Sequence, residues 1–365
     1  MTDEAVPPRL SVTVVVSHLV PTLGTEAAAL RLVADLEQSA DVRVVSLAGG
    51  AADRALRPGT LTAGPRPLTG LRRLATLWRA PRLLRRDSSD VRVLVGAPAA
   101  GAVLLTGRTR PTDVVWEHSL SEARLQGSAP LRLVWSVLRR LYSRVGAVVA
   151  VSPPVADLVQ TSGVRTELVP NAVPAPAHGP GPVDRDPGAP VRLLAVGRLT
   201  SLKNHREIVD ALVVLPGTTR LSIVGEGPER DALVAQATRL GVADRVELLG
   251  HLDADAVRDA MDSATLLVHP SRSETFGLVY LEAAERRLPV VSIDHPAARW
   301  LVPHYVPGVL AQHGHLAEGV SALLAAMPDD AAWRASSAAR SADMDPAGVA
   351  RRWDALLHEV VARRG

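Results

Sequence analysis

The chain has 365 residues, of which 47% are hydrophobic and 22% charged, and its formal net charge is +3. These values exclude an intrinsically disordered chain and indicate a globular protein of about two domains. There is no cysteine, which excludes disulfides and thiolate zinc sites, so a cytoplasmic location is expected. The longest apolar run, residues 10–20, is interrupted by Ser, Thr and His and indicates a buried strand, not an export signal.

Short β-branched runs alternate with amphipathic stretches along both halves of the chain, which predicts parallel sheets covered by helices. In the first half the predicted strands are 10–17, 42–47, 91–96, 114–117, 147–152 and 166–169. In the second half they are 191–196, 220–224, 246–249, 265–269 and 290–293, with helices beginning near Asn204, Pro228, Ala254 and Gly277. The expected fold class is α/β, with two Rossmann-like doubly wound domains facing a central cleft.

Residues 174–190 are packed with Pro and Gly and form the expected linker between a domain over 1–173 and another over 191–345. The Arg-rich stretch 346–365 predicts a helix that packs back on the first domain. Doubly wound sheets bind ligands beyond the carboxyl ends of their strands, so polar residues at strand ends are the candidates for chemistry.

The charge is uneven: residues 1–180 carry a formal +7 and the remainder −4, so only the first half is expected to meet an anionic partner. The stretches 71–86 and 131–144 mix Arg with Leu and Trp. They could contact the inner face of a membrane peripherally, or they could be core-facing helices with solvated arginines, which is the commoner case. Nucleic acid binding is not expected, because only 3% of the residues are aromatic.

One lysine stands out, because all other members of the 41 Lys and Arg residues are arginines. It is Lys203, and it lies five positions after Arg198, in the loop that follows the predicted strand 191–196. Two cations on one loop at the end of a strand suit a diphosphate. The alternative is a solvated loop before a helix.

A second segment combines a strand, a loop and a helix start, and it contains Glu274, Gly277, Leu278 and Glu282. Free N–H groups at the helix start would attract a phosphate. Leu278 and Glu282 share one helix face, so Glu282 could bind a ribose diol while Glu274 reaches the group beyond the phosphate. A nucleoside diphosphate with a polyhydroxylated substituent fits this arrangement.

Segments 197–204, 224–228 and 249–250, together with the pair Glu274 and Glu282, resemble the retaining glycosyltransferase family 4, or group 1, which has the GT-B fold. The resemblance implies that Arg198 and Lys203 neutralise the donor diphosphate, that Glu274 contacts the sugar and that Glu282 contacts the ribose. The loop at 21–26 resembles the family's glycine-rich loop near the phosphates, and His118 stands where the family places a histidine beside the reacting sugar. The implied donor-binding residues are Gly24, Arg198, Lys203, Gly250, Glu274, Phe276, Gly277, Leu278 and Glu282. The implied catalytic residues are His118, Arg198, Lys203 and Glu274.

Three Asp-x-Asp pairs occur, at 184/186, 253/255 and 343/345, and none is expected to bind a metal. One lies in the linker, and the others predict helix caps. No cofactor is expected, because the cations and the helix dipole would stabilise the leaving group.

The expected activity is transfer of a sugar from a nucleotide sugar to a hydroxyl acceptor. Alternatives are a sugar-nucleotide epimerase of the same fold and a non-catalytic nucleotide-sugar-binding protein. Nucleobase, sugar and acceptor, whether a lipid, a polysaccharide or a small metabolite, stay open. The segment 294–299 departs from the family, which often has a glycine pair there, so the donor preference is not carried over.

Overall fold

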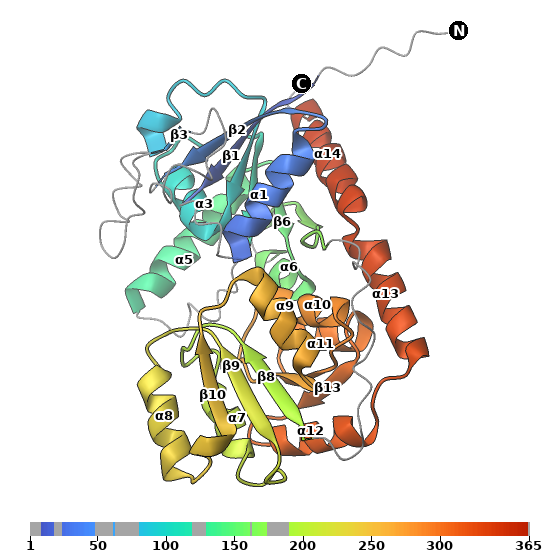
Figure 1. Ribbon diagram of the computed structural model, residues 1–365. Helices are drawn as coiled ribbons and strands as arrows, with labels where there is room; N and C mark the ends of the chain where they lie inside the picture. Colours follow the sequence, from blue (N-terminus) through green and yellow to red (C-terminus); the bar gives the residue numbers. More distant parts are fainter. Residues whose placement is uncertain are drawn as a thin grey trace. The chain divides into compact units, whose positions relative to one another are not determined.

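The computed structural model describes residues 9–17, 24–47, 61–62, 80–118, 129–160, 163–173 and 190–363. The chain divides into two compact units, one made of Met1–Ala172 with Met344–Gly365 and the other of Val173–Asp343. Figure 1 shows the elements of both units.

The first unit is built on a parallel sheet with strand order β3-β2-β1-β4-β5-β6-β7. The strands are β1 Ser11–Val16, β2 Asp41–Ser46, β3 Leu61–Thr62, β4 Val91–Val95, β5 Asp113–Glu117, β6 Ala147–Ala150 and β7 Thr166–Leu168. The helices include α1 Gly24–Leu36, α3 Gly96–Leu104, α5 Ala129–Leu141, α6 Pro153–Gln160 and α14 Pro346–Ala362. Every residue of β4, β5 and β6 is buried, as expected for strands covered on both faces.

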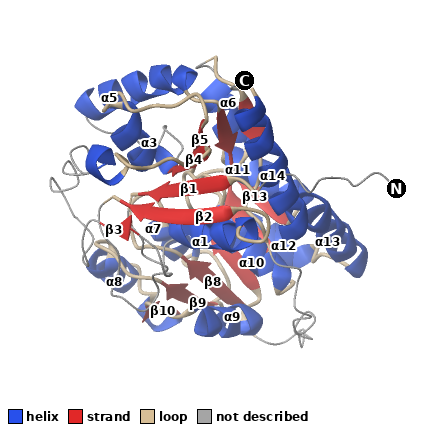
Figure 2. Cartoon of the chain, turned by 90° about the horizontal axis from the view of Figure 1, so that it is seen from above, coloured by secondary structure: helices blue, strands red, loops and turns tan. Residues whose placement is uncertain are grey.

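The second unit contains a parallel sheet with strand order β10-β9-β8-β11-β12-β13, and both views show β8, β9 and β10 side by side (Figures 1 and 2). The strands are β8 Arg192–Val196, β9 Arg220–Val224, β10 Val246–Gly250, β11 Leu266–His269, β12 Val290–Ile293 and β13 Gly308–Ala311. The helices are α7 His205–Ala211, α8 Arg230–Arg239, α9 Ala254–Ser263, α10 Leu278–Glu285, α11 Pro296–His304, α12 Leu316–Ala325 and α13 Asp330–Met344. The strand order reverses between β8 and β11, and such a switch point is where doubly wound sheets bind ligands.

One hydrophobic core of the second unit lies between the sheet and helices α7, α8 and α12. Ile208, Leu233 and Val320 from these helices pack against Leu193 and Ile223 of the strands. Of the remaining helices, α9 packs against β8, and α11 packs against β12 and β13. Helices on both faces leave the strand ends as the place where polar side chains can meet a ligand.

The predicted strands match the observed ones to within two residues at each end. Two strands were not predicted, β3 and β13. The sequence of β13 is short and begins with Gly308, where a Cβ atom would lie 2.2 Å from the carbonyl oxygen of Val290. Pairing with β12 therefore defines this strand, because its own β propensity is weak.

Helix α14 belongs to the first unit although it follows the second unit in sequence. The indole of Trp353 is fully buried, and its ring centroid lies 5.2 Å from that of Trp116 on β5. At the surface of the same helix, Ser39 Oγ donates to Asp354 Oδ1 at 2.8 Å. The aromatic contact anchors the helix, because large aromatic side chains bury the most apolar area.

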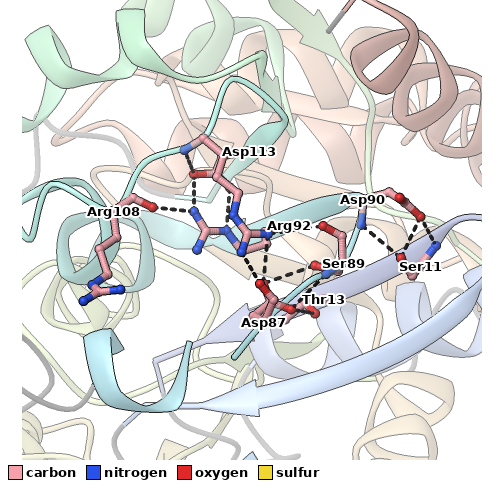
Figure 3. Close-up of polar contacts among 9 residues, drawn as sticks. Ser11, Thr13, Asp87, Ser89, Asp90, Arg92, Arg108 and Asp113 are labelled. Carbon is pink, nitrogen blue, oxygen red and sulfur yellow. Dashed lines mark hydrogen bonds and ion pairs between the residues drawn. The ribbon is translucent and has the colours of Figure 1, made fainter. Parts of the chain in front are cut away.

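A buried polar network joins the amino-terminal ends of β1, β4 and β5 in the first sheet (Figure 3). Arg92 donates to both oxygens of Asp113, at 2.6 and 2.7 Å, and to the carbonyl oxygen of Arg108 at 2.7 Å. The side chains of Arg92 and Asp113 are 1% and 0% exposed. Next to them, Thr13 donates to Asp87 Oδ1 at 2.9 Å. This network was not predicted from the sequence.

Removing one partner of the Arg92–Asp113 pair leaves the other charge buried and unpaired. We expect Asp113→Ala to lower the free energy of unfolding of the first unit by about 3–5 kcal/mol. The exposed pair of Arg9 and Asp41 supplies the control, and Asp41→Ala should change the free energy of unfolding by less than about 1 kcal/mol. Amide hydrogen exchange of β4 and β5 measures the change in the free energy of unfolding in both variants. Equal protection in the two variants would contradict a stabilising role for the pair.

Candidate functional site

The loops that follow β8, β9 and β10 are joined through their backbones. Gly197 N donates to Val224 O at 2.9 Å, and Gly225 N donates to Gly250 O at 2.7 Å. At Gly225, where φ is +135°, a Cβ atom would lie 2.0 Å from the carbonyl oxygen of Gly197. Only glycine allows the two backbone segments to approach this closely, so the first residues of the loop that carries Arg198 are held against the loop after β9.

Lys203 lies at the far end of that loop, and its ammonium forms an ion pair with Glu274 Oε1. Its aliphatic stem passes Gly197, where an added Cβ would be 3.7 Å from two of the lysine methylene carbons. The next residue, Asn204, adopts the left-handed conformation with φ +53° and precedes α7. Lys203 thus carries its ammonium on a flexible side chain, while the backbone turn beneath it has a defined conformation.

Glu274 comes from the loop after β11 and has a second partner in His269, the last residue of that strand. His269 Nε2 lies 2.6 Å from Glu274 Oε1, and the two side chains are only 3% and 12% exposed. Burial raises the pKa of Glu274, but the hydrogen bond from His269 and the charges of His269 and Lys203 outweigh it, so the pKa lies well below the usual range. The carboxylate is ionised at neutral pH.

Behind this pair lies a buried group that was not predicted from the sequence. Tyr280 Oη lies 2.6 Å from Ser292 Oγ and 3.1 Å from His295 Nε2, and its ring packs edge-on against His269 with centroids 4.9 Å apart. Burial lowers the pKa of His295 to about 4, so this ring is neutral at physiological pH. The group links β11, α10, β12 and α11 behind the carboxylate.

Helix α10 begins where a glycine is required. Gly277 has φ +78°, and a Cβ atom there would lie 2.5 Å from the ring of Tyr280. The ring of Phe276 is buried against Trp300, with centroids 5.7 Å apart, so it packs in the core and only the backbone of this residue is available to a ligand. Leu278 is the first residue of the helix, and Glu282 is exposed one turn later.

Arg198 differs from Lys203 in its surroundings. Its side chain is exposed and, within the described residues, has no hydrogen-bond or ion-pair partner. Lys203 is partly neutralised by Glu274, whereas the guanidinium of Arg198 carries its full charge at the same sheet edge. An incoming anion would therefore meet Arg198 as an unpaired cation.

Two of the predicted site residues belong to the first unit. Gly24 is the first residue of α1, and the residues before it in the predicted loop, 21–23, lie outside the described part of the chain. His118 follows β5, and its ring lies 4.3 Å from that of Trp116. Its Nε2 is buried without a hydrogen-bond partner among the described residues, and burial lowers its pKa to about 3. His118 is therefore a neutral imidazole.

The two Asp-x-Asp pairs that the structure describes contribute helix caps, as predicted. Asp253 Oδ1 accepts from Ala256 N at 2.9 Å at the start of α9, and Asp345 Oδ2 accepts from Gly348 N at 2.8 Å at the start of α14. The pair at 184/186 lies outside the described residues.

Two family models match the chain, one in each half. Residues 23–175 match the model for Glycosyltransferase Family 4, and residues 185–340 match the model for Glycosyl transferases group 1. Glycogen synthase of Mycobacterium tuberculosis is 31% identical over 210 residues, which cover 56% of this chain and 50% of that protein. The lipopolysaccharide core biosynthesis glycosyltransferase LpsE of Rhizobium meliloti is 27% identical over 257 residues, 68% of each chain. The chain thus aligns with about half the length of the first of these relatives.

Solved structures share the fold at low sequence identity. Sucrose-phosphate synthase of Thermosynechococcus elongatus superposes with a TM-score of 0.80 at 19% identity, covering 97% of this chain and 100% of that one. HepE of Anabaena, solved with UDP and glucose, gives 0.73 at 20% identity, covering 96% and 100%. Both halves are matched by family models and the fold is shared over 96% of the chain or more, so the protein belongs to the group 1, family 4 glycosyltransferases of the GT-B fold.

Proposed function

We propose that this chain transfers a sugar from a nucleoside diphosphate to a hydroxyl acceptor, with retention of configuration. The contact between Lys203 and Glu274 at the β8–β11 switch point supports this best. It combines a cation suited to a diphosphate with a carboxylate suited to sugar hydroxyls. The fold shared with HepE, which was solved with UDP and glucose, makes a UDP-hexose the first donor to test.

The reaction breaks the bond between the anomeric carbon and the distal phosphate oxygen, and the electron pair leaves with the diphosphate. Lys203 and Arg198 stabilise the negative charge that develops on this leaving group. The acceptor oxygen forms the new bond to the anomeric carbon on the same face, and its proton passes to the departing phosphate oxygen. No protein base is then required, and catalysis rests on charge and position.

The remaining groups bind the donor. Backbone N–H groups of Phe276, Gly277 and Leu278 at the start of α10 face the distal phosphate, Glu282 accepts from the ribose diol, and Glu274 accepts from sugar hydroxyls. Gly250 closes the nucleotide side of the site.

For the first unit, which we assign to the acceptor, we propose that Gly24 contacts the donor phosphates. The neutral ring of His118 positions the sugar and does not transfer a proton, in keeping with its low pKa.

Peripheral membrane contact is proposed for helix α5 of the first unit. Leu133 is 66% exposed and Val137, one turn later, is 37% exposed, with the exposed Arg140 close by in sequence. An apolar strip beside arginines suits an anionic bilayer surface.

In the other Arg-rich stretch, residues 71–79 lie outside the described part, and Leu84 is buried, which supports a core-facing helix there. No helix among the described residues is long and apolar enough to cross a membrane.

Removing the charge of Lys203 tests the central assignment. We expect Lys203→Ala to lower the turnover number for sugar transfer about a hundredfold or more, because the leaving group loses a stabilising cation. Arg206→Ala is the control, since Arg206 lies on α7 beside this loop and pairs with Glu229 at the surface. An undiminished rate in Lys203→Ala, with the protein folded, would overturn the proposal.

Glu282→Ala tests the ribose contact. Thermal shift with UDP, GDP, ADP and dTDP first identifies the nucleotide that stabilises the protein most. Calorimetry with that nucleotide should then show an affinity about tenfold or more lower in the variant, since a charged hydrogen-bond acceptor is lost. Glu318→Ala, on the exposed face of α12, should leave affinity unchanged. If both variants bind equally well, the ribose role is wrong.

Incubation with the donor alone separates transfer from epimerisation, because an epimerase converts the sugar nucleotide without an acceptor. The donor panel consists of sugar nucleotides of UDP, GDP, ADP and dTDP. A protein that neither transfers nor hydrolyses the sugar of any of them would be a non-catalytic binding protein.

Vesicle sedimentation tests the α5 surface. We expect binding to phosphatidylglycerol vesicles that weakens with salt, and at least roughly tenfold weaker binding for Leu133→Glu, which places a negative charge in the strip. Val214→Glu is the matched control, because Val214 is 75% exposed but lies in the second unit. Equal binding by the two variants would contradict the assignment.

A further inference from the structure

Both contacts of Glu274 fall on one carboxylate oxygen. Lys203 Nζ and His269 Nε2 both pair with Oε1, whereas Oε2 has no hydrogen-bond or ion-pair partner among the described residues. Because an ionised carboxylate only accepts hydrogen bonds, His269 Nε2 carries a proton and donates it. One oxygen of Glu274 thus holds the side chain in place, and the other is available to a hydroxyl group.

The two partners differ in how firmly they are held. Lys203 has a flexible four-carbon stem and is 23% exposed, so its ammonium can move toward an anion that binds beside Arg198. His269 is 3% exposed, and its backbone is part of β11, where it pairs with Ser292 of β12. Its ring packs against Tyr280, whose hydroxyl contacts Ser292 and His295. His269 is therefore the contact that persists when Lys203 turns to a ligand.

We propose that His269 is the positioning residue of Glu274, a role that rests on the proposed function. When a nucleotide sugar binds, Lys203 shifts its charge to the diphosphate, and His269 alone keeps the Glu274 carboxylate ionised and aimed at the donor sugar. Without His269 this largely buried carboxylate would lose its fixed donor, and it would turn or take up a proton. The nucleotide half of the donor is held by other groups, so His269 acts on the chemical step.

The test compares two variants at the same position. His269→Leu removes the donor and keeps an apolar side chain in the core, whereas His269→Gln keeps an N–H donor at a similar reach. We expect the turnover number of His269→Leu to fall about a hundredfold, as for a lost preorganised donor, with the affinity for the free nucleoside diphosphate unchanged. His269→Gln should recover a large part of that loss. A residue that merely fills the core would not show this rescue.

A stability control and a double-mutant cycle complete the design. Ser336→Ala removes a buried hydrogen bond to Tyr305 O elsewhere in the second unit, and it should lower the melting temperature without lowering turnover. In a Glu274→Gln background, replacing His269 should cause little further loss, because the residues act as one unit. If His269→Leu does not fold, the cycle is run with His269→Gln, which should also be less than additive with Glu274→Gln.

Unchanged turnover in His269→Leu, equal loss in the Leu and Gln variants, or full additivity with Glu274→Gln would each overturn the positioning role. Those outcomes leave the proposed function intact, because the wild-type protein still transfers sugar. A wild-type protein that is inactive across the donor panel overturns the proposed function and this role together.

Discussion

Parallel pairing of β8 with β11, at the point where the strand order reverses, is the constraint on which the site depends. Leu193 and Leu194 lie in register with Leu266 and Leu267, so the carboxyl ends of the two strands meet at one edge of the sheet. From there the chain continues through separate loops, and Lys203 and Glu274, 71 residues apart in sequence, come into contact. No local feature of either loop could create this contact by itself.

Electrostatics then decides how these groups behave. A carboxylate that is mostly withdrawn from water is stable only when charged or hydrogen-bonding partners compensate its lost hydration. Glu274 has two such partners, the buried His269 on β11 and the partly exposed Lys203 on the loop after β8. Arg198 has no partner among the described residues and Lys203 is held by a single ion pair, which suits a site that binds and releases a multiply charged ligand. The backbone hydrogen bonds from Gly197 to Val224 and from Gly225 to Gly250 join the loops at this sheet edge, and Gly225 closely approaches Gly197.

Much of the fold could be predicted because the signals are local. The β-branched runs predicted all strands except β3 and β13. The capping roles of Asp253 and Asp345 follow from their positions before helices. β13 was not predicted, because its pairing with β12 defines it and its own β propensity is weak. The ion pair of Arg92 and Asp113 was not predicted for a similar reason. In the sequence each resembles an ordinary charged residue at a strand end, and only the sheet brings them together.

The sequence by itself determined the α/β class, the strand ends and the residue types available there, including the single lysine and the two glutamates around Gly277. The tertiary structure decided which of them touch. It showed that Glu274 is shared by Lys203 and His269, although His269 looked like an ordinary strand residue, and it placed the ring of Phe276 in the core. The physical reason is that residue chemistry and periodicity are properties of short segments, whereas burial and charge pairing arise only when distant segments pack.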